Sequence, residues 1–334
     1  MFLYPLRFEP RFVPKMWGGR KLETVLGKRL PAGNIGESWE LYDFAPGVVE
    51  DSPDWVSSRI VNGPLAGRTL HDAVMQFRSD LYGAAPLTGE PGQFPILIKF
   101  LDAREDLSLQ VHPDQAYARA HPGSHLKSEA WYVLQSDPGS RILNGLVPGT
   151  TRRQFEAAVA RGDADRLVAS IPAAAGDCYY LPSGTVHALG AGILVAEVQT
   201  PSDTTFRVFD FNRIDPSTGK PRTLHVREAM ECIDFTFARS SDVSEPAGAQ
   251  LVDSPHFGLH RYHLAGGQVE RIPTGSPTVL IGIEGSATLR GGHLFDPVHI
   301  ARGEVVLVPG ALEDVLLEAA GLCTWLQVRL PVCG

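Results

Sequence analysis

The feature that most constrains the fold is a short pattern that occurs twice in the chain. Residues 176–182 read Gly-Asp-Cys-Tyr-Tyr-Leu-Pro and residues 303–309 read Gly-Glu-Val-Val-Leu-Val-Pro. Upstream, residues 131–135 (Trp-Tyr-Val-Leu-Gln) parallel residues 280–284 (Leu-Ile-Gly-Ile-Glu). A glycine turn, a short apolar run and a closing proline are also common in unrelated β proteins, so coincidence stays open. The repeat favours two similar β-barrels in one chain.

The length of 334 residues fits two such units, and 34 glycines and 26 prolines spread along the chain indicate many turns. We expect an N-terminal domain over 1–240, with helical inserts at about 66–85 and 150–170. A smaller, degenerate copy of the β domain is expected over 241–334. Residues 235–245 are predicted to connect the two.

The helical inserts are predicted from periodicity and capping signals. Apolar residues recur at helical spacing over 69–81, and Thr151 with Gln154 forms a candidate capping box for a helix within 148–162. A short helix is expected over 163–169. Strands are expected where apolar runs or alternation occur: 95–101, 107–111, 131–134, 177–181 and from 193 to 211. Residues 269–330 predict strands and no helix.

Composition excludes several functions. The net charge is −8 and no run of five like charges occurs, which argues against a nucleic-acid or anionic-membrane surface. The four cysteines form neither a CxxC pair nor a disulfide framework. The N-terminus lacks a signal-peptide core, and the longest apolar run is far shorter than the ~20 residues that span a bilayer. We expect a cytoplasmic, unsecreted protein.

Candidate metal ligands lie at the ends of the predicted strands. Gln110 and His112 are two residues apart, so they point from the same face of a strand. Lys127 and Glu129 form a second such pair, and His187 follows the turn at 182–185. Imidazole, carboxylate and amide groups are suitable ligands for a divalent ion. From spacing alone, two interpretations stay open: these residues form a metal site, or they are ordinary buried or solvated side chains.

Longer motifs carry a resemblance to a known family. They are residues 36–41, 95–103, 107–114 (Leu-Ser-Leu-Gln-Val-His-Pro-Asp), 127–134 (Lys-Ser-Glu-Ala-Trp-Tyr-Val-Leu), 176–188 and 202–213. In this order they closely resemble type I mannose-6-phosphate isomerases, a branch of the cupin superfamily. The resemblance runs from about 20 to 213 and fades after 245. The chain resembles the short bacterial type, because it lacks the large helical domain of longer members.

The resemblance implies a mainly β fold of two cupin-like jelly-roll barrels, with helices inserted in and beside the first. It implies interconversion of mannose 6-phosphate and fructose 6-phosphate through an enediol, with one divalent ion, Zn²⁺ above others. The implied roles are as follows: metal ligands Gln110, His112, Glu129 and His187; catalytic residues Arg207, Glu197 and Lys127; and substrate-binding residues Lys127, Arg207 and Glu37.

The general base stays open. Longer members have a histidine directly before the lysine, whereas Leu126 occupies that position here, so no base role carries over to His125. Glu197 is the leading candidate, followed by Lys127; as an alternative, Glu197 is a structural partner of Arg207. Arg213 and Lys220 are further candidates for holding phosphate. Three tryptophans, at 17, 39 and 131, are assigned no role.

Two other classes of function are weighed against the isomerase. One is a cupin enzyme of different chemistry, such as an oxygenase or epimerase, and the other is a non-catalytic sugar-phosphate-binding or regulatory cupin. Gln110 as a ligand and the full set of ionisable residues favour the isomerase. In the second barrel, Asp314 and Thr278 are expected where the first has His187 and Glu129, so no second metal is predicted. The protein is expected to be a monomer or homodimer.

Overall fold

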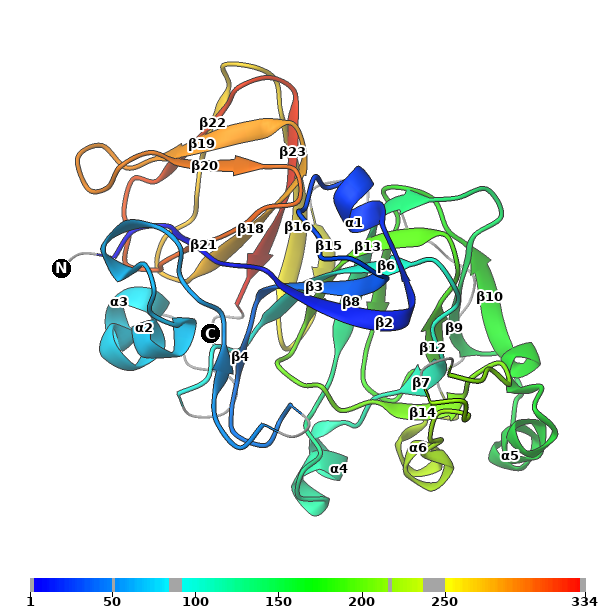
Figure 1. The fold of residues 1–334 in the computed structure, drawn as a ribbon. Coiled ribbons are helices and arrows are strands. Elements are labelled where there is room, and N and C mark those ends of the chain that lie inside the picture. The colour runs from blue at the N-terminus through cyan, green and yellow to red at the C-terminus, as the bar shows by residue number, and fades with distance from the viewer. Residues whose placement is uncertain (1–2, 50–51, 84–91, 216–217, 237–249, 331–334) are drawn as a thin grey trace.

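The first barrel is built from two antiparallel sheets that enclose an apolar core (Figure 1). The computed structural model describes residues 3–49, 52–83, 92–215, 218–236 and 250–330. One sheet has the strand order β11 (Cys178–Leu181), β8 (Glu129–Ser136), β13 (Ile193–Gln199), β6 (Leu97–Ala103), β2 (Arg11–Gly19) and β3 (Ile35–Leu41). The other has the order β10 (Val168–Pro172), β9 (Arg141–Leu146), β12 (His187–Leu189), β7 (Leu109–Val111) and β14 (Phe206–Phe209). Side chains such as Trp131 and Leu189 fill the space between them.

The second barrel repeats this topology. Its larger sheet has the order β1 (Leu6–Arg7), β21 (Val305–Val308), β18 (Thr278–Glu284), β23 (Cys323–Arg329), β16 (Gly258–Leu264) and β15 (Gln250–Asp253). Its smaller sheet has the order β17 (Val269–Arg271), β22 (Leu316–Ala319), β19 (Ser286–Arg290) and β20 (Val298–Ala301). The series β11-β8-β13-β6 thus matches β21-β18-β23-β16, and β10-β9-β12-β7 matches β20-β19-β22-β17. The prediction of a mainly β chain with two barrels is confirmed.

Strand register corrects one predicted equivalence between the barrels. Glu129 and Thr278 do correspond, because they lie opposite Leu181 and Val308, the residues that precede the two prolines of the repeat. Asp314, however, lies in an exposed left-handed turn with φ of 55°. The residue that corresponds to His187 is Leu316, two residues after Asp314. Leu316 is the first residue of β22, just as His187 is the first residue of β12. A two-residue extension of the loop explains why counting from the proline misplaced the position.

The division of the chain at residue 240 remains a proposal. The pairing of β15 to β23 within their own sheets supports it. The exception is β1, which pairs with β21 of the second barrel although it begins the chain. Of the predicted connector 235–245, the part from 237 onward lies outside the described residues.

The helices flank the barrels (Figure 1). They are α1 (Lys21–Thr24), η1 (Gly63–Leu65), α2 (Leu70–Gln76), α3 (Arg78–Tyr82), α4 (Gln115–Ala120), α5 (Arg152–Arg161), η2 (Ala164–Leu167) and α6 (Val226–Cys232). Strands β4 (Asp43–Phe44) and β5 (Val56–Ser57) form a small separate sheet. Among the described residues, no helix is both long and apolar enough to cross a membrane.

Several local predictions hold and some need correction. Thr151 and Gln154 form the predicted capping box of α5. The short helix expected over 163–169 is the 3₁₀ helix η2, which ends at Leu167 because β10 begins at Val168. The single helix expected over 69–81 is two short helices, because Phe77 leaves the helical region with φ −123° and ψ 32°. The apolar stretch 193–211 is divided between β13 and β14, which belong to different sheets. The helices α1, η1, α4 and α6 were not predicted.

Candidate metal centre and active-site cleft

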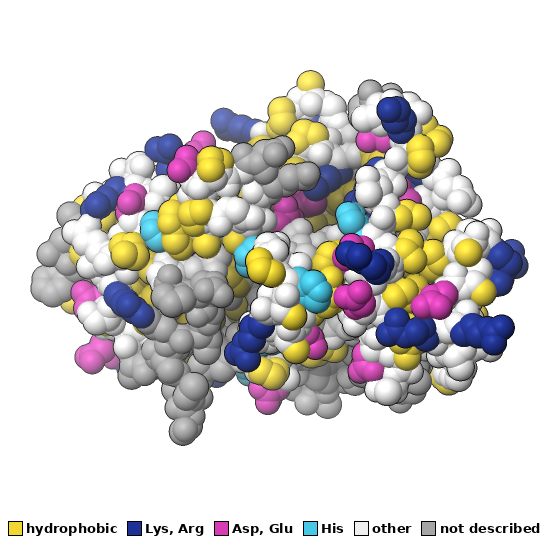
Figure 2. Space-filling model, turned by 90° about the horizontal axis from the view of Figure 1, so that it is seen from below, with side chains coloured by type: hydrophobic (Ala, Val, Ile, Leu, Met, Phe, Trp, Pro, Cys, Tyr) yellow, Lys and Arg dark blue, Asp and Glu magenta, His cyan; other side chains and the backbone are white. Residues whose placement is uncertain are grey.

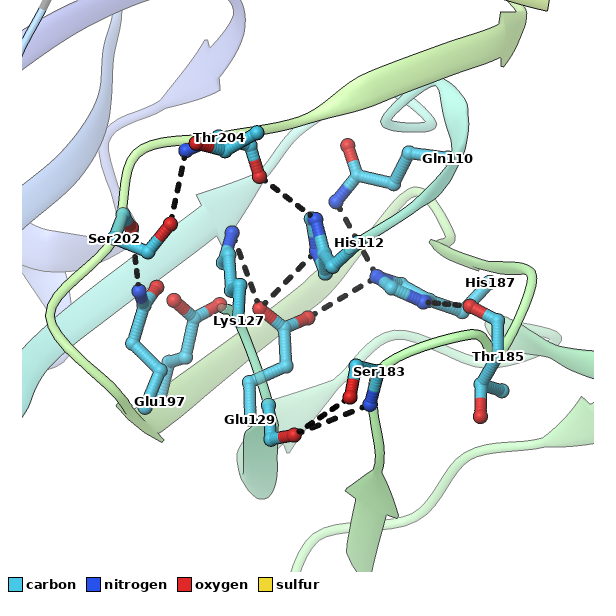
Figure 3. Close-up of polar contacts among 12 residues, drawn as sticks. Gln110, His112, Lys127, Glu129, Ser183, Thr185, His187, Glu197, Ser202 and Thr204 are labelled. Atoms are coloured by element: carbon cyan, nitrogen blue, oxygen red, sulfur yellow. Dashed lines mark hydrogen bonds and ion pairs between the residues drawn. The ribbon is translucent and has the colours of Figure 1, made fainter. Parts of the chain in front are cut away.

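Three buried ligand groups converge inside the first barrel (Figure 3). His187 is the first residue of β12 and lies directly opposite Gln110 of β7, while Glu129 is the first residue of β8. His112 follows β7 immediately before Pro113. Nε2 of His187 lies 3.1 Å from Oε1 of Glu129, and Nε2 of His112 lies 3.4 Å from Oε2. The ligand atoms of these three residues all lie within 4.8 Å of one another.

The backbone fixes which nitrogen of each imidazole faces the cluster. Nδ1 of His187 lies 2.9 Å from the carbonyl of Thr185, and Nδ1 of His112 lies 3.1 Å from the carbonyl of Thr204. A carbonyl only accepts, so each Nδ1 carries the proton and donates it. The lone pairs on both Nε2 atoms therefore point toward the carboxylate of Glu129. This arrangement of backbone-oriented imidazoles is typical of metal sites.

Unsatisfied acceptors show what the cluster lacks. Among the described residues, Nε2 of His112 and both carboxylate oxygens of Glu129 are buried without a hydrogen bond, and Oε2 of Glu129 forms an ion pair with Nζ of Lys127 at 3.2 Å. Acceptors that face acceptors in a buried site repel one another unless a cation lies between them. The residues present therefore fit a bound divalent ion.

The protonation of these groups suits the same ion. Burial and the ammonium of Lys127 lower the pKa of His112 to about 3, so its imidazole is neutral. Burial alone would raise the pKa of Glu129, but Lys127 and His112 hold it well below its usual range. Imidazole nitrogens and a carboxylate are a common ligand set for zinc-like ions.

Gln110 lies beside the cluster. Its Nε2 atom is 3.3 Å from Nε2 of His187. A half-turn of the terminal amide exchanges its nitrogen and oxygen, which would place a ligand oxygen beside the imidazole. The structure thus brings all four sequence-predicted ligands together, and the role of Gln110 as a ligand remains a proposal.

The cluster adjoins a cleft of about 890 Å³. Figure 2 shows this face of the molecule, where histidine, acidic and basic side chains gather around the central hollow. The predicted residues Glu37, Gln110, Lys127, Glu197 and Arg207 all line the cleft. Lys127 joins the two features, because its Nζ lies 3.2 Å from Oε2 of Glu129.

Arg207 is fixed at one wall of the cleft. It lies opposite Gln110 in the β14–β7 pair, and it donates hydrogen bonds to Oγ of Ser108 at 3.2 Å and to the carbonyl of Thr223 at 2.8 Å. Burial and the guanidinium groups of Arg222 and Arg213 lower its pKa. The guanidinium groups of Arg213 and Arg222 both bind the carboxylate of a single acid, Asp210. This wall therefore carries more positive than negative charge.

The opposite wall carries the two predicted carboxylates. Glu197 accepts a hydrogen bond from the indole of Trp131 at 2.8 Å, and Glu37 accepts one from the indole of Trp39 at 2.7 Å. Burial raises the pKa of Glu197. Burial would raise that of Glu37 too, but Lys15 and Lys99 lower it to about 2. The two carboxylates thus differ in their electrostatic surroundings.

The sequence interpretation missed several cleft residues. Lys99 lies between the two carboxylates, 2.8 Å from Oε1 of Glu197 and 3.9 Å from Oε2 of Glu37. The available signal was a single lysine inside the apolar run 95–101, because a lysine is buried only when it is paired. Trp39 and Trp131, to which the sequence assigns no role, orient the two carboxylates. Asp203 also lines the cleft.

The fold and the site define a class: a two-barrel β protein with a candidate divalent-metal centre at the edge of a charged cleft. Comparisons with known proteins agree. Residues 6–139 match the sequence profile of the phosphomannose isomerase type I catalytic domain. The chain is 37% identical to a Bacillus subtilis protein named probable mannose-6-phosphate isomerase, over 79% of this chain and 81% of that protein. It is 33% identical to mannose-6-phosphate isomerase of Streptococcus mutans, over 88% of this chain and 92% of that protein.

A solved structure extends the likeness to the whole fold. The crystal structure of mannose 6-phosphate isomerase from Bacillus subtilis superposes with a TM-score of 0.83 at 28% identity, covering 98% of this chain and 99% of that one. The chain belongs to the type I family of mannose-6-phosphate isomerases.

Proposed function

We propose that the protein interconverts mannose 6-phosphate and fructose 6-phosphate by moving a proton between C1 and C2 of the open-chain sugar. The observation that carries this proposal is that Lys127 lies next to two features at once. One is the buried candidate cation site, and the other is the cleft whose walls carry Arg207, Glu197 and Glu37. A sugar phosphate is anionic at one end and carries carbonyl and hydroxyl oxygens at the other. The cleft offers complementary groups to both.

The proposed metal ligands are Gln110, His112, Glu129 and His187, and the proposed ion is zinc. Nitrogen and oxygen donors of this kind suit Zn²⁺, which needs no redox partner for an isomerisation. An ion held there would supply Lewis-acid stabilisation of negative charge that develops on the substrate oxygens. The proposed role of Lys127, whose Nζ lies 3.2 Å from Oε2 of Glu129, is to donate a hydrogen bond to the same oxygens.

Glu197 is the proposed carrier of the proton. Its two oxygens are held by Trp131 and Lys99, so the carboxylate has one orientation toward the cleft. Burial raises its pKa toward the working pH, which improves a carboxylate as a general base. Such base catalysis typically contributes ~10²–10⁴-fold. Glu37, which also lines the cleft, is the proposed acceptor for a sugar hydroxyl.

Arg207 is the proposed partner of the phosphate or of a developing oxyanion. Its neighbours Arg213 and Arg222 share one carboxylate, so a dianionic group would relieve repulsion among the three guanidiniums. Lys220 and Arg222 line the same cleft and extend this positive wall.

Further parts of the proposal concern the setting of the site. We propose that residues 241–334 support the first barrel and bind no second metal, since Thr278 and Leu316 offer poor ligands at the positions of Glu129 and His187. The cysteine spacing supports a cytoplasmic location. Monomer and homodimer are both compatible with the proposed chemistry.

The test is a coupled assay that follows fructose 6-phosphate formed from mannose 6-phosphate by the metal-loaded protein. Turnover is expected, and Arg207→Ala is expected to lower kcat/KM by about 10²–10³-fold with metal retained, because it removes a preorganised charge. Absence of turnover in protein with a full complement of metal would favour a regulatory sugar-phosphate-binding protein. Near-normal turnover of R207A would remove Arg207 from the mechanism.

A further inference from the structure

A row of alternating charges runs along one wall of the cleft. Lys15 lies 3.1 Å from Oε1 of Glu37, and Glu37 is followed by Lys99 and then Glu197. Lys15 is partly exposed, whereas the side chains of Lys99 and Glu197 are 7% and 3% exposed. The buried end of the row is therefore the end that lies nearest the proposed chemistry.

We propose that Lys99 is a positioning residue, whose buried ammonium keeps Glu197 ionised and holds its carboxylate in one orientation toward the substrate. The inference rests on the proposed function, in which Glu197 carries the proton. Lys99 itself touches two carboxylates and is not assigned a contact with the reacting atoms.

The strand register explains why Lys99 can do this. Lys99 of β6 lies directly opposite Glu197 of β13 on one side and opposite Trp39 of β3 on the other. Glu197 in turn lies opposite Trp131 of β8. Paired residues on neighbouring strands point to the same face of a sheet, so these side chains form one row across it. The position of the ammonium is set by the sheet itself.

One ion pair and one hydrogen bond complete the orientation of Glu197. Oε1 lies 2.8 Å from Nζ of Lys99, and Oε2 accepts the indole hydrogen of Trp131 at 2.8 Å. A carboxylate with a fixed cation at one oxygen and a fixed donor at the other is restricted in rotation about its terminal bond. Without Lys99, only the indole would remain to orient it.

The electrostatic surroundings give Lys99 a second effect. Three charged groups act on Glu197: Lys99 from β6, Glu129 at the start of β8, and Lys127 two residues before that strand. Burial raises the pKa of Glu197, Lys99 offsets the largest part of that rise, and Glu129 adds to it. Removal of Lys99 must therefore raise the pKa of Glu197 further. On acidification, Glu197 would then become protonated at a higher pH than in wild type.

The experiment reads Glu197 through its hydrogen-bond partner. Metal-loaded protein labelled with ¹⁵N-tryptophan gives indole signals from five tryptophans, and the one lost in W131F belongs to Trp131. Its chemical shift, followed from about pH 5 to 9, reports the ionisation of Glu197. We expect the midpoint in Lys99→Met to lie at least about one pH unit above that of wild type, and K99R, which keeps the charge, to lie closer to wild type.

A matched control separates this effect from the loss of any buried lysine. Lys28 forms an equally buried pair with Glu40, 2.7 Å apart and 8% and 6% exposed, outside the residues that line the cleft. K28M is expected to leave the Trp131 midpoint unchanged. If K99M does not fold, as judged by circular dichroism, K99Q replaces it with the same expected shift. A folded, uncharged variant at position 99 with the wild-type midpoint would overturn the proposal.

The second readout is the pH profile of isomerase activity. In K99M, the acid limb of kcat/KM is expected to move upward by the same amount as the Trp131 midpoint, with bound metal unchanged. A shifted midpoint without a shifted acid limb would also overturn the role of Lys99 in positioning the base. Should wild type show no isomerase activity, the proposed function fails, whereas the indole midpoint still decides whether Lys99 controls Glu197.

Discussion

Each histidine of the candidate metal centre has one ring nitrogen bound by the backbone and the other directed at Glu129. Thr185 and Thr204 supply the carbonyls that fix this arrangement. Because backbone atoms hold the rings, the site does not depend on the ion to orient its ligands. The cost of burying unsatisfied acceptors is then offset when a cation binds.

Removal of one imidazole should abolish tight metal binding. For His187→Ala we expect metal affinity to fall at least about 100-fold, since even residues that only support a ligand are worth 10–100-fold. Metal content by mass spectrometry of elements and competition with a chromophoric chelator measure this. The control is H299A, because His299 is an exposed histidine of the second barrel. Equal metal content in H187A and wild type would show that the ligand assignment is wrong.

The sequence predicted that the candidate ligands lie together, but it did not predict which residues pair with Glu197. Gln110 with His112 and Lys127 with Glu129 could be found because spacing of two places side chains on one face of a strand. The partners of Glu197 could not be found this way. Lys99 and Trp131 reach it across neighbouring strands, and this pairing depends on register between segments far apart in the chain.

At the scale of elements, short strands and their turns place the ligands. β7 and β12 contain three residues each, and their single direct pair joins Gln110 and His187. β8 starts at Glu129, so the carboxylate enters the cluster from the other sheet. The two sheets of the barrel thus contribute ligands to one point between them.

The helix α5 stands apart from this machinery and offers a test of local folding. The side chain of Thr151 accepts a hydrogen bond from the backbone of Gln154, whose side chain accepts one from the backbone of Thr151. Thr151→Ala should lower the free energy of unfolding by about 1 kcal/mol without changing isomerase activity. Urea denaturation measures this change. T150A, at the residue before the cap, is the control and should stay within about 0.5 kcal/mol of wild type; an equal loss in both variants would contradict the capping role.

Capping signals predicted α5, but periodicity failed for α4 and α6. Helix α4 has no buried residue, so its sequence carries no apolar stripe to detect. Helix α6 buries only Ala229 and Met230 within seven residues. The break at Phe77 between α2 and α3 was also invisible, because the apolar spacing continues through it.

At the scale of the molecule, the two barrels share one apolar core. Tyr132, Ala196 and Val198 on the outer face of the first barrel belong to the same buried cluster as Leu326 and Val328 of the second. The helix pair α2–α3 packs into this cluster, and the backbone amide of Gly310 bonds to Leu81. The repeat predicted two barrels, but neither their shared core nor the pairing of β1 with β21 could be foreseen, because both join segments distant in sequence.

The shared core predicts that the barrels unfold together. Leu326→Ala, at a fully buried position of this core, should lower the free energy of unfolding by about 2–5 kcal/mol in one cooperative transition. Denaturation followed by both tryptophan fluorescence and loss of activity measures it. L322A, at an exposed leucine of the same barrel, should stay within about 0.5 kcal/mol of wild type. Loss of the second barrel's structure at a denaturant concentration that leaves isomerase activity intact would contradict the shared core.

The central claim is that the cluster of His112, Glu129 and His187 holds the ion on which isomerisation depends. The most direct measurement is turnover of mannose 6-phosphate against bound metal per chain, as a chelator removes the metal and added Zn²⁺ restores it. The account predicts activity proportional to bound metal, reaching zero as the metal is removed and returning with one ion per chain. Undiminished turnover in metal-depleted protein would contradict it.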